Sequence, residues 1–209
     1  HTYKPKKHRI GGWYLSEKLD GQRCFWDGGI TRGELKSDVP WANTAKDERY
    51  VEEQYSTGLW SRYGNVIHAP DWWLNKLPNV MLDGELYIPG FRQDLMKIIK
   101  KLEPGPGWKR VKFHVFEMPG EEIFDDGRLS TPNFEKILKG ISPDLSSLDY
   151  VPSGVTLFRS KVTLIKKYCD GDIAVAHPQK KLPAQTQKAL DILDKKLAEV
   201  TDAGGEGVM

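Results

Sequence analysis

The stretch SEKLDGQRCFWDGG, residues 16–29, sets one lysine two positions before an Asp-Gly pair and one arginine two positions after it. Apolar residues alternate with polar ones before the Asp-Gly pair, and a second apolar run, Cys24-Phe25-Trp26, follows it. An Asp-Gly pair between two such runs is typical of a turn between strands. The pattern therefore predicts strand, turn, strand, with Lys18 at the end of the first strand beside a loop.

Lys18 is either a charged residue on that turn or a nucleophile. A lysine becomes a nucleophile when its ammonium loses a proton, and burial or neighbouring cations favour that loss. Two further Gly-containing stretches supply acids, Glu85 in LDGELY and Glu206 in GGEGVM. Carboxylates suit Mg²⁺, and Mg²⁺ together with Lys and Arg can neutralise the charge of a phosphoryl-type transfer. Each acid alone would be an ordinary surface residue, but together the groups indicate a nucleotide site.

Composition excludes several classes of protein. Of the 209 residues, 39% are hydrophobic and 29% are charged, which is near the average for globular domains and argues against disordered, collagen-like and membrane proteins. No apolar run has the length of a membrane span, and no signal-peptide pattern opens the sequence. The two cysteines lack the spacing of a zinc site, so we expect free thiols. The sequence predicts a soluble, cytoplasmic protein.

Strand and helix patterns alternate along the rest of the chain. Residues 80–89 predict a second strand, Asp-Gly turn and strand, and residues 111–118 alternate as a half-buried strand. Helices are predicted at 45–55, 93–102, 130–140 and 185–200. No internal repeat or low-complexity linker interrupts the chain. The mixture predicts a single α+β domain with mainly antiparallel sheets.

Five blocks give the sequence a specific resemblance. EKLDGQR resembles motif I of the covalent nucleotidyltransferases, which comprise the ATP-dependent DNA ligases, RNA ligases and mRNA capping enzymes. LWSRYGN (59–65) resembles motif Ia, LDGELY (82–87) motif III, HVFEM (114–118) motif IIIa and GEGVM (205–209) motif IV, in the family's order. TRG (31–33) is a rival for motif Ia, but the distance from SRYGN to LDGEL is more similar to the family's. The resemblance implies a nucleotidyltransferase (ATP-grasp-like) adenylation domain over residues 1–209, with two mainly antiparallel sheets flanked by helices.

The resemblance also implies the reacting groups. Lys18 would attack the α-phosphate of ATP, release pyrophosphate and hold AMP as a covalent intermediate. Asp20 would assist with metal and with the later attacks. Glu206 would help to hold Mg²⁺, and Glu85 would bind the ribose or the metal.

Four more residues are implied in nucleotide binding. Arg23 would contact the ribose and the nick, and Arg62 would position phosphate or ribose. Phe116 would stack on the adenine, in keeping with the affinity of aromatic faces for bases, although an alternating strand by itself favours a core position for it. Glu17 joins this set, even though DNA ligases often carry the acid one place earlier.

Some family features do not occur in the sequence. Motif V, with its two phosphate-binding lysines, should follow GEGVM, and the C-terminal OB domain should follow in turn. We therefore expect an adenylation domain truncated just after motif IV, with the OB domain absent and with slow or no self-adenylation by these residues alone. Residues 31–57 look like an insertion that serves either nucleic-acid contact or packing.

Among the family's functions, the sequence is most similar to small, phage-type ATP-dependent DNA ligases, which would place it in a host cytoplasm if it were phage-encoded. This implies sealing of nicks in duplex DNA during replication or repair by a monomer without membrane contact. The basic runs at 3–9 and 108–112 would then meet DNA phosphates or remain solvated surface. An RNA ligase or a capping guanylyltransferase is the alternative. A third is a non-catalytic nucleotide- or DNA-binding module.

Overall fold

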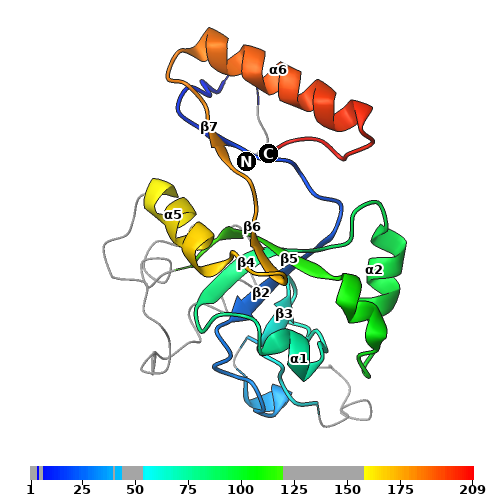
Figure 1. Ribbon diagram of the computed structural model, residues 1–209. Coiled ribbons are helices and arrows are strands. Elements are labelled where there is room, and N and C mark those ends of the chain that lie inside the picture. Colours follow the sequence, from blue (N-terminus) through cyan, green and yellow to red (C-terminus); the bar gives the residue numbers. More distant parts are fainter. Residues whose placement is uncertain (1–3, 5–6, 40, 44–53, 120–157) are drawn as a thin grey trace. The chain divides into compact units, whose positions relative to one another are not determined.

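The computed structural model describes residues 4, 7–39, 41–43, 54–119 and 158–209 (Figure 1). The helix predicted at 130–140 and most of the one at 45–55 lie outside the described residues. The chain divides into two compact units, one formed by residues 1–20 with 177–209 and the other by residues 21–176. Each unit contains its own hydrophobic clusters, and the assignment of 1–209 to a single adenylation domain stays a prediction.

A five-stranded sheet forms the centre of the larger unit, with the order β3-β2-β4-β5-β6 (Figure 1). Its strands are β2 (Gln22–Asp27), β3 (Leu59–Ser61), β4 (Met81–Tyr87), β5 (Lys112–Glu117) and β6 (Ala174–Ala176). Neighbouring strands are antiparallel except for β5 and β6, which are parallel. The predicted strand at 111–118 is confirmed as β5.

Helices cover one face of this sheet, since α1 (Asp71–Leu74), α2 (Arg92–Ile99), α5 (Phe158–Tyr168) and the 3₁₀ turn η3 (Pro106–Arg110) all contribute to the main core cluster. A second 3₁₀ turn, η1 (Lys36–Asp38), lies in the connection from β2 to β3. Leu95 and Ile99, one turn apart on α2, are buried with Phe113 and Val115 of β5 in the main core cluster. The predicted helix at 93–102 is thereby confirmed. Among the helices of the described residues, none combines the length and the apolar character needed to cross a bilayer.

The connection from β2 to β3 runs through residues 28–58. A two-residue turn is enough to join two antiparallel strands, and this connection is much longer than that. Trp41 from the connection packs with Phe25, Trp60 and Met81 in a second cluster. These buried side chains support a packing role for the described part of residues 31–57.

Buried polar groups hold the base of the connection. The fully buried carboxylate of Asp27 accepts hydrogen bonds from the backbone N–H of Gly29 at 2.8 Å, the hydroxyl of Thr31 at 2.6 Å and the indole N–H of Trp60 at 3.1 Å. Burial raises the pKa of Asp27, and these hydrogen bonds oppose the rise. The carboxylate therefore has the partners that a buried acid needs.

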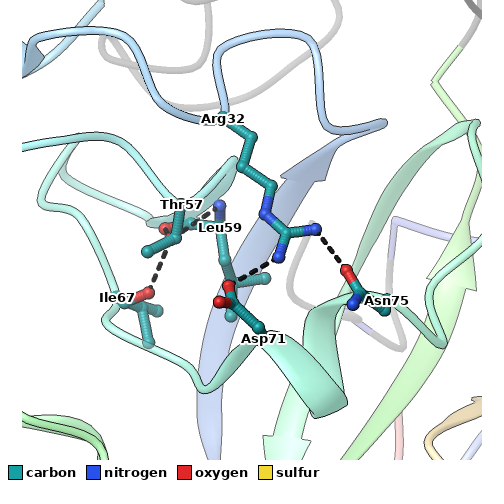
Figure 2. A network of polar contacts seen from close by, with 6 residues as sticks. All are labelled: Arg32, Thr57, Leu59, Ile67, Asp71 and Asn75. Carbon is teal, nitrogen blue, oxygen red and sulfur yellow. Dashed lines mark hydrogen bonds and ion pairs between the residues drawn. The ribbon is translucent and has the colours of Figure 1, made fainter.

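Arg32 ties the connection to helix α1. Its guanidinium donates to Asp71 Oδ1 and to Asn75 Oδ1, each at 2.6 Å, as Figure 2 shows. Beside it, the hydroxyl of Thr57 donates to the carbonyl of Ile67 at 2.7 Å. In this structure, Arg32 of the TRG segment therefore links two parts of the larger unit.

The smaller unit combines a short sheet with one long helix. Strand β1 (Tyr14–Leu15) pairs with β7 (Lys180–Lys181) in antiparallel fashion, and helix α6 (Thr186–Asp202) follows. The apolar side chains of the unit form a cluster: Ile10, Leu15, Leu182 and Ala189, with Leu190, Ile192, Leu193 and Val208 packed against it. The predicted helix at 185–200 is confirmed.

The first predicted strand-turn-strand unit occurs along the chain, with a bend at Asp20-Gly21 between β1 and β2, but its two strands do not pair with each other. The second predicted unit is wrong. β1 pairs with β7 rather than β2, and β4 runs without interruption through Asp83 and Gly84. A Cβ on Gly84 would lie 2.4 Å from the carbonyl oxygen of His114, so this glycine allows β4 and β5 to approach closely. The local pattern indicated a turn at Asp83-Gly84, but Gly84 instead allows β4 and β5 to pack closely.

Candidate active site

Lys18 belongs to the smaller unit, where a backbone ladder joins it to the GEGVM segment. Ser16 and Met209 exchange two backbone hydrogen bonds of 2.8 Å, and the N–H of Lys18 donates to the carbonyl of Gly207 at 2.8 Å. The Lys18 ammonium also forms an ion pair with the Glu206 carboxylate. The structure thus brings together two predicted site residues that are 188 positions apart in sequence.

Glycines on both sides of Glu206 allow this approach. Gly207 has φ of 140°, a value that side chains rarely adopt. A Cβ on Gly205 would lie 2.6 Å from Val200 Cγ1. The Lys18 and Glu206 side chains are 47% and 41% exposed, so the pair is open to solvent. Lys18 therefore lacks the burial expected for a nucleophilic lysine, and its ion-pair partner here is a carboxylate and not a cation.

Glu17 and Asp20 flank Lys18 within the same unit. Glu17 lies opposite Val208 in an antiparallel bridge, and its carbonyl accepts a hydrogen bond of 2.8 Å from Nε2 of His177. His177 is buried, and burial lowers its pKa, with Glu17 opposing the effect. The backbone next to Lys18 is therefore held by a histidine that the sequence did not single out.

Four predicted residues of the larger unit come from β2, β4, β5 and the turn after β3. Arg23 lies directly opposite Glu85, which in turn lies opposite His114. Glu85 Oε1 accepts a hydrogen bond of 2.9 Å from the N–H of Gly21. Arg62 follows the end of β3 and contributes a positive charge near Asp83.

Arg23 is held by a buried carboxylate. Its Nε and Nη2 donate to the two oxygens of Asp83 at 3.1 and 2.6 Å, and the Asp83 side chain is only 1% exposed. Burial raises the pKa of Asp83, while Arg23 and Arg62 act in the opposite direction. Burial also acts against the charged guanidinium, yet the hydrogen bond and charge of Asp83 leave the pKa of Arg23 above its ordinary value. A two-point contact of this kind fixes the guanidinium plane.

A β-bulge sets the position of Phe116. Asp83 pairs with Glu117 and Gly84 with Val115, which leaves Phe116 as the extra residue on β5. The guanidinium carbon of Arg23 lies 5.5 Å from the centre of the Phe116 ring. Phe116 is half-buried and lies outside the core clusters, so the bulge directs it toward Arg23.

Sequence reasoning did not find three charged residues of this region. Asp83 stood in the quoted LDGELY block but was assigned to a turn. Glu117 and Lys161 form an ion pair at 3.2 Å, although Lys161 is only 7% exposed. Lys161 lies on α5, a helix that the sequence analysis did not predict, and only its contact with β5 identifies it.

Among the residues that the structure describes, few groups could serve together as metal ligands. In the described part of the chain, no three or more His, Cys, Asp and Glu side chains gather into a group that could hold a metal ion. Mg²⁺ commonly takes one or two carboxylates and completes its shell with water and substrate phosphates. Glu85 and Glu206 are suitable oxygen donors of this kind, one in each unit.

We compared the sequence with protein-family models and with curated proteins. No protein-family model matches the chain. A DNA ligase of Haemophilus influenzae is 28% identical over 122 residues, which are 58% of this chain and 34% of that ligase. The chain therefore spans about a third of the length of this curated relative.

Solved structures agree over nearly the whole chain. A structure from a study of DNA binding by Lig E DNA ligases with a minimal scaffold superposes with a TM-score of 0.60 and 22% identity, covering 99% of this chain and 57% of that one. The chain shares the fold of the part of this DNA ligase structure that it covers. Two further structures, Pmar-Lig_Pre and Pmar-Lig_PreS3, give TM-scores of 0.53 and 0.52 at 22% identity, each covering 98% of this chain and 39% of its own. The resemblance inferred from the five blocks and the α+β class with two sheets are confirmed.

Proposed function

We propose that the chain is the adenylation domain of an ATP-dependent DNA ligase. The observation that carries this proposal is the ladder between residues 16–18 and 207–209, which sets the Lys18 ammonium against the Glu206 carboxylate. An amine can attack only after losing a proton, and in this proposal the Glu206 carboxylate, which contacts the Lys18 ammonium, would receive it. The DNA ligase relative and the ligase fold support the choice of reaction class.

The first step would join AMP to Lys18. The neutral Nζ attacks the α-phosphorus of ATP, an N–P bond forms, and the bond from that phosphorus to the bridging oxygen breaks. Pyrophosphate leaves with the electron pair, and the proton from Nζ passes to Glu206. Mg²⁺ bound to the phosphates would supply charge neutralisation, with Glu85 as a carboxylate ligand while Glu206 takes the proton. Asp20, two residues after Lys18, would assist in this and the later attacks.

The sheet of the larger unit would hold the nucleotide. Phe116 offers an aromatic face to the adenine, and Arg23 and Glu85 offer polar groups to the ribose. Arg62 would contact phosphate or ribose, and Glu17 is a further nucleotide-binding candidate. Because Asp83 already fixes Arg23 at two points, the guanidinium loses little freedom on binding.

Nick sealing would complete the reaction. AMP passes from Lys18 to the 5′-phosphate at a nick in duplex DNA, and the adjacent 3′-hydroxyl then displaces AMP and closes the strand. The basic run at residues 3–9 would contact backbone phosphates, so binding should weaken as salt rises. We place this activity in cytoplasmic DNA replication or repair, carried out by a monomer.

Labelled nucleotides and nicked substrates test the proposal. The full-length protein with Mg²⁺ should take label from α-labelled ATP and pass it to a nicked DNA duplex. Label from GTP in place of ATP would indicate a capping enzyme, and sealing of nicked RNA alone would indicate an RNA ligase. Nucleotide or DNA binding with no covalent label would contradict the proposal and indicate a non-catalytic module.

A further inference from the structure

Two carboxylates face each other beside the proposed nucleotide site. Asp83 on β4 and Glu117 on β5 are directly opposite in the sheet, and their side chains are 1% and 23% exposed. Like charges in directly opposed positions destabilise a strand pair. Burial raises the pKa of Glu117, Lys161 opposes the rise, and the charge of Asp83 adds to it. This pair of acids therefore needs compensating cations.

Each of the two acids forms an ion pair with a different cation. Arg23 donates to both oxygens of Asp83, and Lys161 Nζ lies 3.2 Å from Glu117 Oε1. A lysine as buried as Lys161 is rare unless it is paired. Lys161 comes from α5, which packs against β5, so its charge reaches the sheet from a separate element (Figure 1).

The separate pairing of Glu117 with Lys161 matters because Arg23 contacts a second group besides Asp83. Its guanidinium lies over the Phe116 ring, one residue before Glu117. Were Glu117 to lose its own cation, the guanidinium with its five N–H donors would be drawn toward two carboxylates in place of one. Such a shift would move Arg23 away from the position in which Asp83 now fixes it above the Phe116 ring.

We propose that Lys161 is a positioning residue of this site: by neutralising Glu117, it keeps Arg23 bound to Asp83 and placed over Phe116 to receive the nucleotide. This inference rests on the proposed function for its kinetic consequence. The effect of the Lys161 charge on the position of Arg23 does not depend on catalysis and can be measured without it. Lys161 itself need not touch the substrate.

Adenylation kinetics provide the first test. In the full-length protein, Lys161→Met removes the charge while keeping the length of the side chain, and should raise KM for ATP about tenfold with kcat changed less than about twofold. Lys161→Arg should keep the KM of the unmodified protein. Lys166→Met, an exposed lysine of the same helix, is the matched control and should have no effect.

A second substitution separates charge from packing. Glu117→Gln keeps the shape of the side chain and removes the charge that Lys161 neutralises. Added to Lys161→Met, it should return KM to within about threefold of the original value. A double variant no better than Lys161→Met, or a loss of kcat with KM unchanged, would overturn the inference.

An NMR measurement keeps the two proposals distinguishable. The Nε–H signal of Arg23 should shift in Lys161→Met, return in the double variant and stay in place in Lys166→Met, whether or not the protein forms an adenylate. Absence of labelling in the unmodified protein would count against the proposed function alone. An Arg23 signal that does not respond to Lys161→Met would overturn the positioning role alone.

Discussion

The two units hold their ion pairs in different surroundings. In the smaller unit, Lys18 and Glu206 are 47% and 41% exposed, and a backbone ladder brings them together. In the larger unit, Arg23 makes a two-point contact with Asp83, whose side chain is 1% exposed. The proposed reactive amine thus lies where solvent screens charge, whereas the half-buried Arg23 is fixed by a carboxylate that is fully buried. Substitutions in the two units should therefore separate activity from stability.

Asp83→Ala should have the largest effect on stability. It leaves the half-buried Arg23 without its carboxylate, and breaking a buried pair in this way costs about 3 kcal/mol in the free energy of unfolding. Urea unfolding of the variant measures this. Asp94→Ala is the control, because its pair with Arg110 is exposed and should contribute less than about 1 kcal/mol. Equal losses in both variants would remove the contrast between buried and exposed pairs.

Gly84→Ala should destabilise the larger unit by about 1–3 kcal/mol, because the new Cβ would lie 2.4 Å from the carbonyl oxygen of His114 and force β4 and β5 apart. Thermal unfolding checks the change. Gly105→Ala is the matched control, since a Cβ there meets nothing within 4 Å. If Gly84→Ala were as stable as Gly105→Ala, the close approach at the bulge would not be needed.

His177→Gln should change how stability depends on pH. The pKa of folded His177 lies below the ordinary value of 6.5, so below about pH 6.5 the unfolded chain binds a proton that the folded chain does not. Stability should fall as the pH falls through this window, by at most about 1.4 kcal/mol per pH unit. The glutamine amide can still donate to the Glu17 carbonyl but does not titrate.

Unfolding at about pH 7.5 and 5.5 measures the difference between the two proteins. The original protein should lose stability relative to His177→Gln at the lower pH. Parallel losses in both would show that another group dominates the acid response.

Glu206→Gln should have the smallest effect on stability, less than about 1 kcal/mol, because the ion pair it removes is exposed. Its effect on adenylation should nevertheless be large, since the amide cannot take the proton from Lys18. Chemical unfolding and ATP labelling of the same preparation test both statements. A variant that unfolds easily and still labels fully would reverse the comparison between the units.

Sequence alone predicted the elements whose patterns are local. The helices at 93–102 and 185–200 and the strand at 111–118 show clear periodicity, and each occurs in the structure. Asp20-Gly21 lies at a bend as predicted, whereas Asp83-Gly84 lies inside a strand, because the same dipeptide suits a turn or a close strand contact. Only the pairing of β4 with β2 and β5 decides between them.

In the candidate site, too, local sequence motifs could be recognised from the sequence, whereas contacts that depend on tertiary structure could not. The family resemblance pointed to Lys18 and Glu206, which the structure brings together, and to Arg23 and Glu85, which it sets opposite each other. It did not identify Lys161, because a lysine in an amphipathic stretch is ordinary until its partner is known. The partnership with Glu117 depends on a bulge and on the docking of α5, which are tertiary features.

The most direct test of the account is to locate the adenylate. The full-length protein is incubated with ATP and Mg²⁺, digested, and its peptides are examined by mass spectrometry for bound AMP. The account predicts AMP on Lys18, and no adduct in Lys18→Ala, while Lys161→Met still carries AMP on Lys18 at saturating ATP. AMP on a different lysine, or an adduct that persists in Lys18→Ala, would contradict it.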